Sequence, residues 1–205
     1  MIFTREGKTL HFIAIPKTGT TTVVRALEES GWLLGEEYTS RRVSNHEPYY
    51  VWSKTLAGRD FDYSFSIVRD PVERFTSKIS STLSREAGVS YEEIRLGNWM
   101  TRSAHAALSE MLPRLGKDFY DYHYVPQHCF PARDTEIFKF ENFSQIVDTL
   151  KSRGVLDKNC SIGHENKTDK NTRSLKIDFN YRDLKEFFLG WYGKDFEIFD
   201  YDMKL

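Results

Sequence analysis

Two short segments of the chain carry residue types that can hold an anion. The first is P-K-T-G-T-T-T at 16–22, between an apolar run at 9–15 and a helix-forming run at 20–30. Gly19 lets the backbone approach an anion closely, and the N–H groups at a helix start point toward it. Lys17 supplies a point charge. The segment is therefore predicted to bind a phosphate-like anion, and the alternative is a turn capped by threonines.

The candidate ligands of that anion run from the lysine to the last threonine. They are Lys17, Thr18, Gly19, Thr20, Thr21 and Thr22. The pattern differs from the G-x-x-x-x-G-K-[ST] loop of ATPases and kinases, because here the lysine stands two residues before the glycine. This departure argues against an ordinary ATPase or kinase.

The second segment is S-I-V-R-D-P-V-E-R-F-T-S at 66–77. Arg69 follows an apolar run, so its guanidinium is expected at a strand end, where it can hold a phosphate bidentately. Asp70 and Pro71 suit the start of a helix. Ser77 then lies two turns into that helix, where its hydroxyl can reach the same anion. The alternative is that Arg69 pairs with a carboxylate and Ser77 faces solvent.

Alternating strands and helices are predicted to position these segments. The expected strands are 9–15, 63–68 and 135–140, and the expected helices are 20–30, one from Asp70 onward, 143–153 and 181–191. This order predicts an α/β domain with a parallel sheet. In such sheets ligands bind at the carboxyl ends of the strands, where both segments fall. No linker or repeat interrupts the chain, so one domain over 1–205 is expected.

Composition excludes several classes of protein. The net charge of −1 argues against a general nucleic-acid binder. Cys129 and Cys160 are expected to be free thiols, and no Cys/His cluster has the spacing of a zinc site. No apolar run has the length of a membrane span, and the first residues lack the apolar core of a signal peptide. A cytoplasmic protein without a bound metal is expected.

Together the two segments resemble the sulfotransferases that use 3′-phosphoadenosine-5′-phosphosulfate (PAPS), among them the Golgi carbohydrate and heparan sulfate 2-O and 6-O enzymes. In that family a P-K-[ST]-G-[ST]-[ST] loop holds the 5′-phosphosulfate, which implies this role for Lys17 to Thr22. An R-[DN]-P-x-x-R-x-x-S segment holds the 3′-phosphate, which implies that role for Arg69 and Ser77.

Later segments extend the resemblance to about 9–201. They are K-F-E-N-F at 139–143, H-E-N-K-T at 164–168, W-Y-G-K-D-F at 191–196 and F-D-Y at 199–201. The second of them lies over the nucleotide in the family, which implies cofactor contacts for Asn166 and Lys167. The resemblance implies a P-loop NTPase-like three-layer α/β/α fold with a central parallel sheet. It also implies PAPS as donor, PAP as product and no metal.

Sulfuryl transfer needs charge stabilisation at the leaving phosphate and a base for the acceptor hydroxyl. Lys17 is predicted to stabilise the leaving group. His46 is the candidate base, because the heparan enzymes place a histidine between the two phosphate motifs; His123 is the second choice. The expected acceptor is a carbohydrate, with tyrosine, lipid or small-metabolite acceptors left open. The alternative functions are a P-loop kinase and a catalytically silent nucleotide-binding module.

Overall fold

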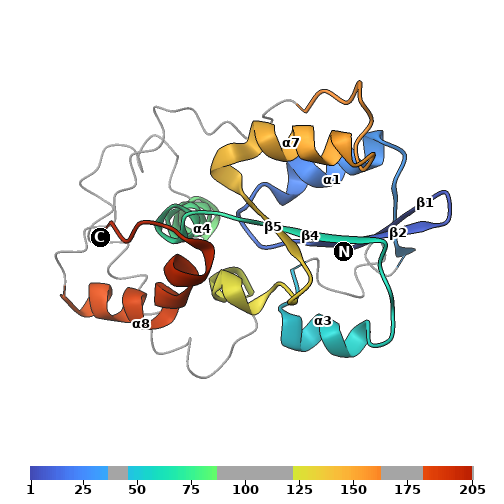
Figure 1. Ribbon diagram of the computed structural model, residues 1–205. Helices are drawn as coiled ribbons and strands as arrows, with labels where there is room; N and C mark the ends of the chain where they lie inside the picture. Colours follow the sequence, from blue (N-terminus) through green and yellow to red (C-terminus); the bar gives the residue numbers. More distant parts are fainter. Residues whose placement is uncertain (37–45, 87–121, 163–181, 205) are drawn as a thin grey trace. The chain divides into compact units, whose positions relative to one another are not determined.

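The computed structural model describes residues 1–36, 46–86, 122–162 and 182–204 (Figure 1). The chain divides into two compact units, Met1–Asp70 with Val125–Asn166 and Pro71–Tyr124 with Lys167–Leu205. The first unit contains the sheet, and the second contains two long helices. The expectation of one domain over 1–205 stays a prediction.

A five-stranded sheet with the order β3-β1-β2-β4-β5 forms the centre of the first unit. Its strands are β1 (Ile2–Arg5), β2 (Lys8–Ile13), β3 (Leu33–Leu34), β4 (Tyr63–Val68) and β5 (Glu136–Lys139). β2, β4 and β5 are the three predicted strands, and they are parallel. β1 is antiparallel to both of its neighbours. The predicted parallel arrangement therefore holds for β2, β4 and β5, but β1 and β3 make the sheet as a whole mixed.

The turn between β1 and β2 explains this difference. Only Glu6 and Gly7 separate the two strands, and they have φ values of 52° and 75°. A two-residue turn with two positive φ values matches the twist of an antiparallel hairpin, whereas parallel strands need a long crossover. The ladder runs from Ile2 opposite His11 to Arg5 opposite Lys8. β1 thus extends the parallel strands on the side away from β5.

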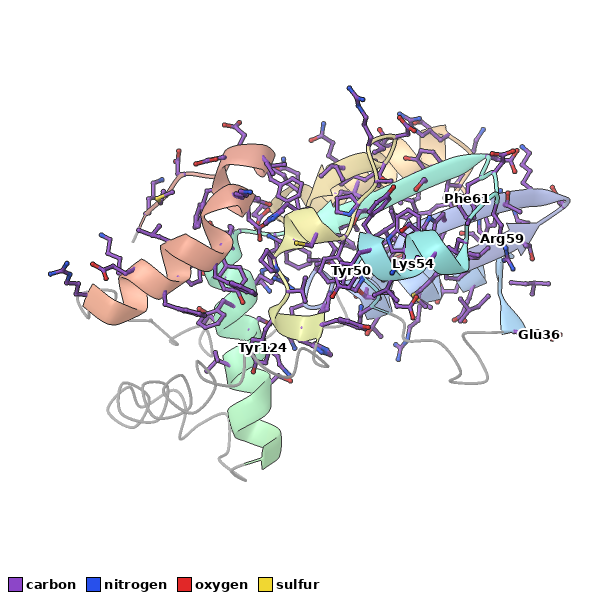
Figure 2. All side chains as sticks on the ribbon, turned by 90° about the horizontal axis from the view of Figure 1, so that it is seen from below. Glu36, Tyr50, Lys54, Arg59, Phe61 and Tyr124 are labelled. Atoms are coloured by element: carbon purple, nitrogen blue, oxygen red, sulfur yellow. The ribbon has the colours of Figure 1, made fainter. Side chains whose placement is uncertain are left out.

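Helices lie on both faces of this sheet (Figure 1). α1 (Thr20–Glu29) and α7 (Phe143–Ser152) cover one face, and α3 (Tyr49–Thr55) covers the other. Figure 2 views the unit from the α3 side, where Tyr50 and Lys54 are exposed on the helix. The observed class is therefore mixed α/β, in agreement with the coarse prediction.

The two helices on the first face begin and end close to where the sequence predicts. α1 buries Val23, Ala26 and Leu27 and stops before Gly31, whose φ of 84° ends the helix. α7 ends before Gly154 in the same way, with φ 69°. Asn142 is the N-cap residue of α7, but among the described residues no side chain caps this helix start. The short 3₁₀ helix η3 (Phe140–Asn142) leads into α7 instead.

Aromatic and aliphatic side chains from the sheet and these helices form one core. Phe12 and Phe65 on adjacent strands are fully buried and stack with ring centroids 4.8 Å apart. Burial of such a ring contributes about 2 kcal/mol. Leu27 from α1 and Ile146 from α7 belong to the same cluster. The core therefore fixes the strand ends relative to the start of α1.

The second unit contains α4 (Pro71–Glu86), the 3₁₀ helix η1 (Tyr122–Tyr124) and α8 (Arg182–Phe199). Phe75 of α4 lies edge-on to Phe188 of α8, with centroids 5.4 Å apart. α4 starts at Pro71 as predicted. α8 continues eight residues beyond the predicted end at 191, because Phe188, Tyr192, Phe196 and Phe199 extend the buried stripe past two glycines.

Side-chain hydrogen bonds from α4 and α8 hold η1 in this unit. Arg74 is 2% exposed and donates to the carbonyl oxygen of His123 at 3.1 Å. The carbonyl oxygen of Tyr124 accepts hydrogen bonds from the Tyr192 hydroxyl at 2.8 Å and from the Trp191 indole at 3.1 Å. These bonds satisfy polar groups that would be costly to bury unpaired.

Candidate functional site

The carboxyl ends of the three parallel strands lie at one edge of the sheet. β2 leads into the 16–22 loop, β4 leads into Arg69, and β5 leads into Phe140. The last ladder pairs at this edge are Ile13 with Ser66 and Val68 with Lys139. Residues just beyond the ladder have no strand neighbour for their peptide groups, so those groups must bond to side chains, to other parts of the backbone or to a ligand.

The backbone of the 16–22 loop is held in its shape by its own threonines. The Thr18 hydroxyl donates to the carbonyl oxygen of Ile15 at 2.8 Å, and the Thr20 hydroxyl donates to the same oxygen at 3.1 Å. Thr18 is fully buried. Lys17 has a φ of 71°, which is unusual for a residue with a side chain. The two threonines therefore stabilise a strained turn at Lys17.

The loop ends at the start of α1 in a form that suits an anion. Gly19 is the N-cap residue with φ 86°, and no side chain among the described residues caps the first turn. That turn contains no acidic residue, so the partial positive charge of the helix start is not offset locally. Lys17 and Thr20 are half-buried, Thr21 is exposed and Thr22 is buried. The arrangement can bind a phosphate or sulfate group through backbone N–H groups.

Phe140, at the end of β5, leaves no room for a side chain at position 19. A Cβ at this position would lie 2.9 Å from Cε2 of Phe140, closer than carbon atoms approach. Phe140 packs in turn against Phe143 at the start of α7, with ring centroids 5.8 Å apart. The end of β5 therefore sets the position of the loop that follows β2.

Arg69 contacts both of these elements. Its Nη1 atom donates to the carbonyl oxygen of Lys17 at 3.4 Å, and its guanidinium carbon lies 4.9 Å from the centre of the Phe140 ring. The two anion-binding segments predicted from the sequence thus meet in the first unit. Two cationic side chains, Lys17 and Arg69, lie at one sheet edge. This pair can neutralise an anionic ligand.

The main chain beside Arg69 is bound by two further side chains. Gln127 accepts from the Arg69 N–H at 2.8 Å and donates to the Arg69 carbonyl oxygen at 2.7 Å. Glu141 accepts from the N–H of Asp70 at 2.8 Å. The role of Gln127 could not be predicted from the sequence, because a lone glutamine after a proline carries no local signal.

His46 lies against the short segment that joins β2 to the 16–22 loop. Its Nδ1 atom is 2.8 Å from the carbonyl oxygen of Ala14. A carbonyl only accepts, so Nδ1 carries the proton and the basic lone pair of the neutral ring is on Nε2. This tautomer is the one that a general base at Nε2 needs.

His11 is buried inside β2 at 2% exposure. Its ring lies 4.8 Å from that of Trp52 and 4.6 Å from that of Phe61. Burial, with a smaller contribution from the N-terminal ammonium, lowers the pKa of His11 to about 3. The ring is therefore neutral and part of the core under α3.

The remaining predicted residues lie elsewhere. Ser77 is half-buried on α4, and His123 is half-buried in η1; both belong to the second unit. Asn166 and Lys167 lie outside the described residues. Within the described residues, the candidate site therefore comprises the 16–22 loop, His46 and Arg69, with contacts from Gln127 and Phe140.

Within the described part of the chain, no cluster of three or more His, Cys, Asp or Glu side chains is arranged to hold a metal ion. Cys129 and Cys160 are both free thiols, the first half-buried and the second buried. No described helix combines the length and the apolar character needed to cross a membrane. Comparison of the chain with protein-family models, curated proteins and solved structures gave no match in any of the three.

Proposed function

We propose that the protein is a sulfotransferase that binds PAPS at the carboxyl edge of its parallel strands and sulfates an acceptor hydroxyl. A carbohydrate is the proposed acceptor class. The observation that carries the proposal is the contact between the two anion-binding segments, in which Nη1 of Arg69 meets the carbonyl oxygen of Lys17 at 3.4 Å. A ligand with phosphate groups at two positions of one nucleoside fits two such segments side by side.

The donor set of the site suits this nucleotide. The start of α1 offers backbone N–H groups beside Lys17, where a 5′-phosphosulfate would bind. Arg69 offers a second, separate cation for a 3′-phosphate. Phe140 fills the space on the far side of Gly19, so the loop can present only its backbone there. These features support a site for two anionic groups rather than one.

Lys17, His46 and Arg69 then each have a distinct role in sulfuryl transfer. PAPS supplies the sulfuryl group that the acceptor oxygen receives. Lys17 stabilises the negative charge that develops on the departing phosphate oxygen. His46 takes the proton of the acceptor hydroxyl at Nε2, because Nδ1 is occupied by its hydrogen bond to Ala14. Arg69 orients the nucleotide so that the reacting atoms stay aligned.

Calorimetric titration with PAP, AMP and ADP tests the nucleotide assignment. We expect PAP to bind more tightly than the other two, and we expect Lys17→Ala and Arg69→Ala each to weaken PAP binding roughly 10- to 100-fold, since each removes a charged hydrogen-bond donor. Lys158→Ala, an exposed lysine of the same unit, is the matched control. Equal affinity for PAP and ADP would favour a kinase-like nucleotide site instead.

Transfer of labelled sulfate from PAPS tests the reaction itself. A panel of neutral glycans, acidic glycans, tyrosine peptides and small phenols identifies the acceptor class, and the mass of the product establishes a sulfate ester. We expect transfer to at least one glycan. A protein that binds PAP tightly but transfers sulfate to none of these acceptors would be a nucleotide-binding module without this activity.

A further inference from the structure

Gln127 forms a two-point bridge to the main chain of Arg69. The side-chain oxygen accepts from the Arg69 N–H at 2.8 Å, and the side-chain nitrogen donates to the Arg69 carbonyl oxygen at 2.7 Å. The orientation of the amide follows from these partners, because an N–H only donates and a carbonyl only accepts. The bridge joins residues separated by 58 positions in the sequence.

The bridge lies where the sheet stops. β4 pairs with β2 as far as Ser66 and with β5 as far as Val68, so Arg69 is one residue past the last ladder pair. The amide of Gln127 supplies the acceptor and the donor that a neighbouring strand would otherwise supply to Arg69. The side chain is completely buried, and a buried amide is costly unless both of its ends are bonded. Here both ends are bonded to the same residue.

Other contacts fix the rest of Arg69 and hold Gln127 in place. The guanidinium lies over the Phe140 ring at 4.9 Å and reaches the Lys17 carbonyl oxygen. The 3₁₀ helix η2 (Gln127–Cys129) is anchored by Trp52, whose indole N–H donates to the carbonyl oxygen of Phe130 at 2.9 Å. Arg69 is thus constrained at its backbone by η2 and at its side chain by η3 and the 16–22 loop.

We propose that Gln127 is a positioning residue that orients the Arg69 guanidinium toward the 3′-phosphate of the bound nucleotide. Gln127 does not touch the ligand; it fixes the backbone from which the arginine extends. This inference rests on the proposed function for the identity of the ligand. It predicts that loss of the bridge weakens recognition of the 3′-phosphate while leaving recognition of the 5′-group intact.

Two nucleotides that differ in the 3′-phosphate separate this role from a general structural one. PAP carries that group and AMP lacks it. For Gln127→Met, which keeps the length of the side chain but loses the amide, we expect PAP to bind roughly tenfold more weakly, since two hydrogen bonds that fix the arginine are lost. AMP affinity is expected to change less than about twofold by the same reasoning. Equal weakening for both nucleotides overturns the proposal.

Gln127→Glu adds a second measurement, the pH dependence of PAP affinity, which a purely structural role of Gln127 would not change. A protonated carboxyl can accept from the Arg69 N–H and donate to its carbonyl oxygen, as the amide does. An ionised carboxylate has no proton to donate, so the bridge breaks as pH rises. We expect the ratio of variant to wild-type PAP affinity to be near one at low pH and to fall as pH rises. Gln145→Glu, which places the same charge on an exposed position of α7, is the control.

The outcomes separate this inference from the proposed function. If the wild-type protein does not bind PAP, the proposed function fails and the inference fails with it. If the wild type binds PAP and Gln127→Glu shows no pH dependence beyond that of Gln145→Glu, the function stands and the bridge does not position Arg69. Should Gln127→Met prove unfolded in thermal melts, the pH series of Gln127→Glu decides the question by itself.

Discussion

The imidazole of His46 is hydrogen-bonded to the segment between β2 and the 16–22 loop, because its Nδ1 atom donates to the carbonyl oxygen of Ala14 at 2.8 Å. Ala14 precedes Lys17 by three positions in the chain. The same peptide segment therefore holds the proposed base and leads to the proposed leaving-group cation. A base that is fixed relative to the loop can keep its distance to a ligand bound there.

His46→Ala and His46→Asn test this arrangement together. Both remove the basic nitrogen, but the asparagine amide can still donate to Ala14. We expect turnover to fall by roughly 100-fold or more in both variants, as for loss of a general base. PAP affinity is expected to stay within about twofold of the wild type in His46→Asn, because no hydrogen bond of the loop is lost.

His123→Ala is the control for the His46 variants, because His123 is the other histidine that the sequence favours as base. Steady-state rates with saturating PAPS and calorimetric PAP affinities are the two measurements. A wild-type rate in His46→Asn together with a lost rate in His123→Ala would transfer the role of base to His123.

Gly19→Ala tests the contact between the loop and the end of β5. The new Cβ would lie 2.9 Å from Phe140, and the residue would keep a φ of 86°. The left-handed backbone alone costs about 1 kcal/mol for alanine. We expect a larger loss of unfolding free energy and a loss of PAP affinity, because the loop or the Phe140 ring must shift.

Gly58→Ala is the matched control for that prediction. Gly58 has a similar φ of 77°, but a Cβ there meets nothing within 4 Å. Chemical denaturation of both variants separates the backbone cost, which they share, from the steric cost, which only Gly19→Ala carries. Equal destabilisation of the two would mean that Phe140 yields easily and does not fix the loop.

The elements that could be predicted from the sequence are those with local signals. α1 has an apolar stripe at helical spacing and a glycine stop at Gly31, and both are visible within a dozen residues. The three parallel strands are apolar runs, and the first two are followed by the cationic residues Lys17 and Arg69. The loop and Arg69 could be placed at one sheet edge because parallel strands present their carboxyl ends together.

The features that could not be predicted from the sequence depend on distant partners. β1 is identified by its pairing with β2, and its antiparallel direction follows from a two-residue turn at Glu6 and Gly7. The bridge from Gln127 joins a side chain to the backbone of a residue far away in the chain. Because nearly every residue type has the same peptide groups, a side chain that bonds to the backbone does not determine the residue type of its partner. Tertiary structure alone reveals such a contact.

Burial of His11 predicts a pH dependence of stability. The pKa of His11 falls from 6.5 in the unfolded chain to about 3 in the fold. The folded state therefore needs the neutral ring. Its contribution is fully present above pH 6.5 and is lost as pH falls from 6.5 toward 3. By pH 5 the loss amounts to about 2 kcal/mol.

His11→Phe is expected to remove that part of the acid sensitivity while keeping an aromatic ring between Trp52 and Phe61. Urea denaturation at a series of pH values measures the difference between variant and wild type. His123→Phe, a half-buried histidine of the second unit, controls for the loss of any histidine. Identical pH profiles for His11→Phe and the wild type would show that His11 accepts a proton without unfolding the sheet.

Tyr192→Phe tests the polar contact that holds η1 in the second unit. The hydroxyl of this buried tyrosine donates to the carbonyl oxygen of Tyr124 at 2.8 Å. Burial raises the pKa of Tyr192, so the phenol remains a donor at every ordinary pH. We expect the variant to lose about 1 kcal/mol of unfolding free energy. The loss stays modest because the Trp191 indole still bonds the same carbonyl oxygen.

Tyr49→Phe provides the comparison for Tyr192→Phe, since Tyr49 is 47% exposed and water can replace any partner of its hydroxyl. Denaturation followed by tryptophan fluorescence reports on both variants. A loss well above that of one hydrogen bond would indicate that the Tyr192 hydroxyl also supports the neighbouring Arg74 and Asp195, whose charges act on its pKa. No loss at all would mean that the Trp191 contact is sufficient to hold η1.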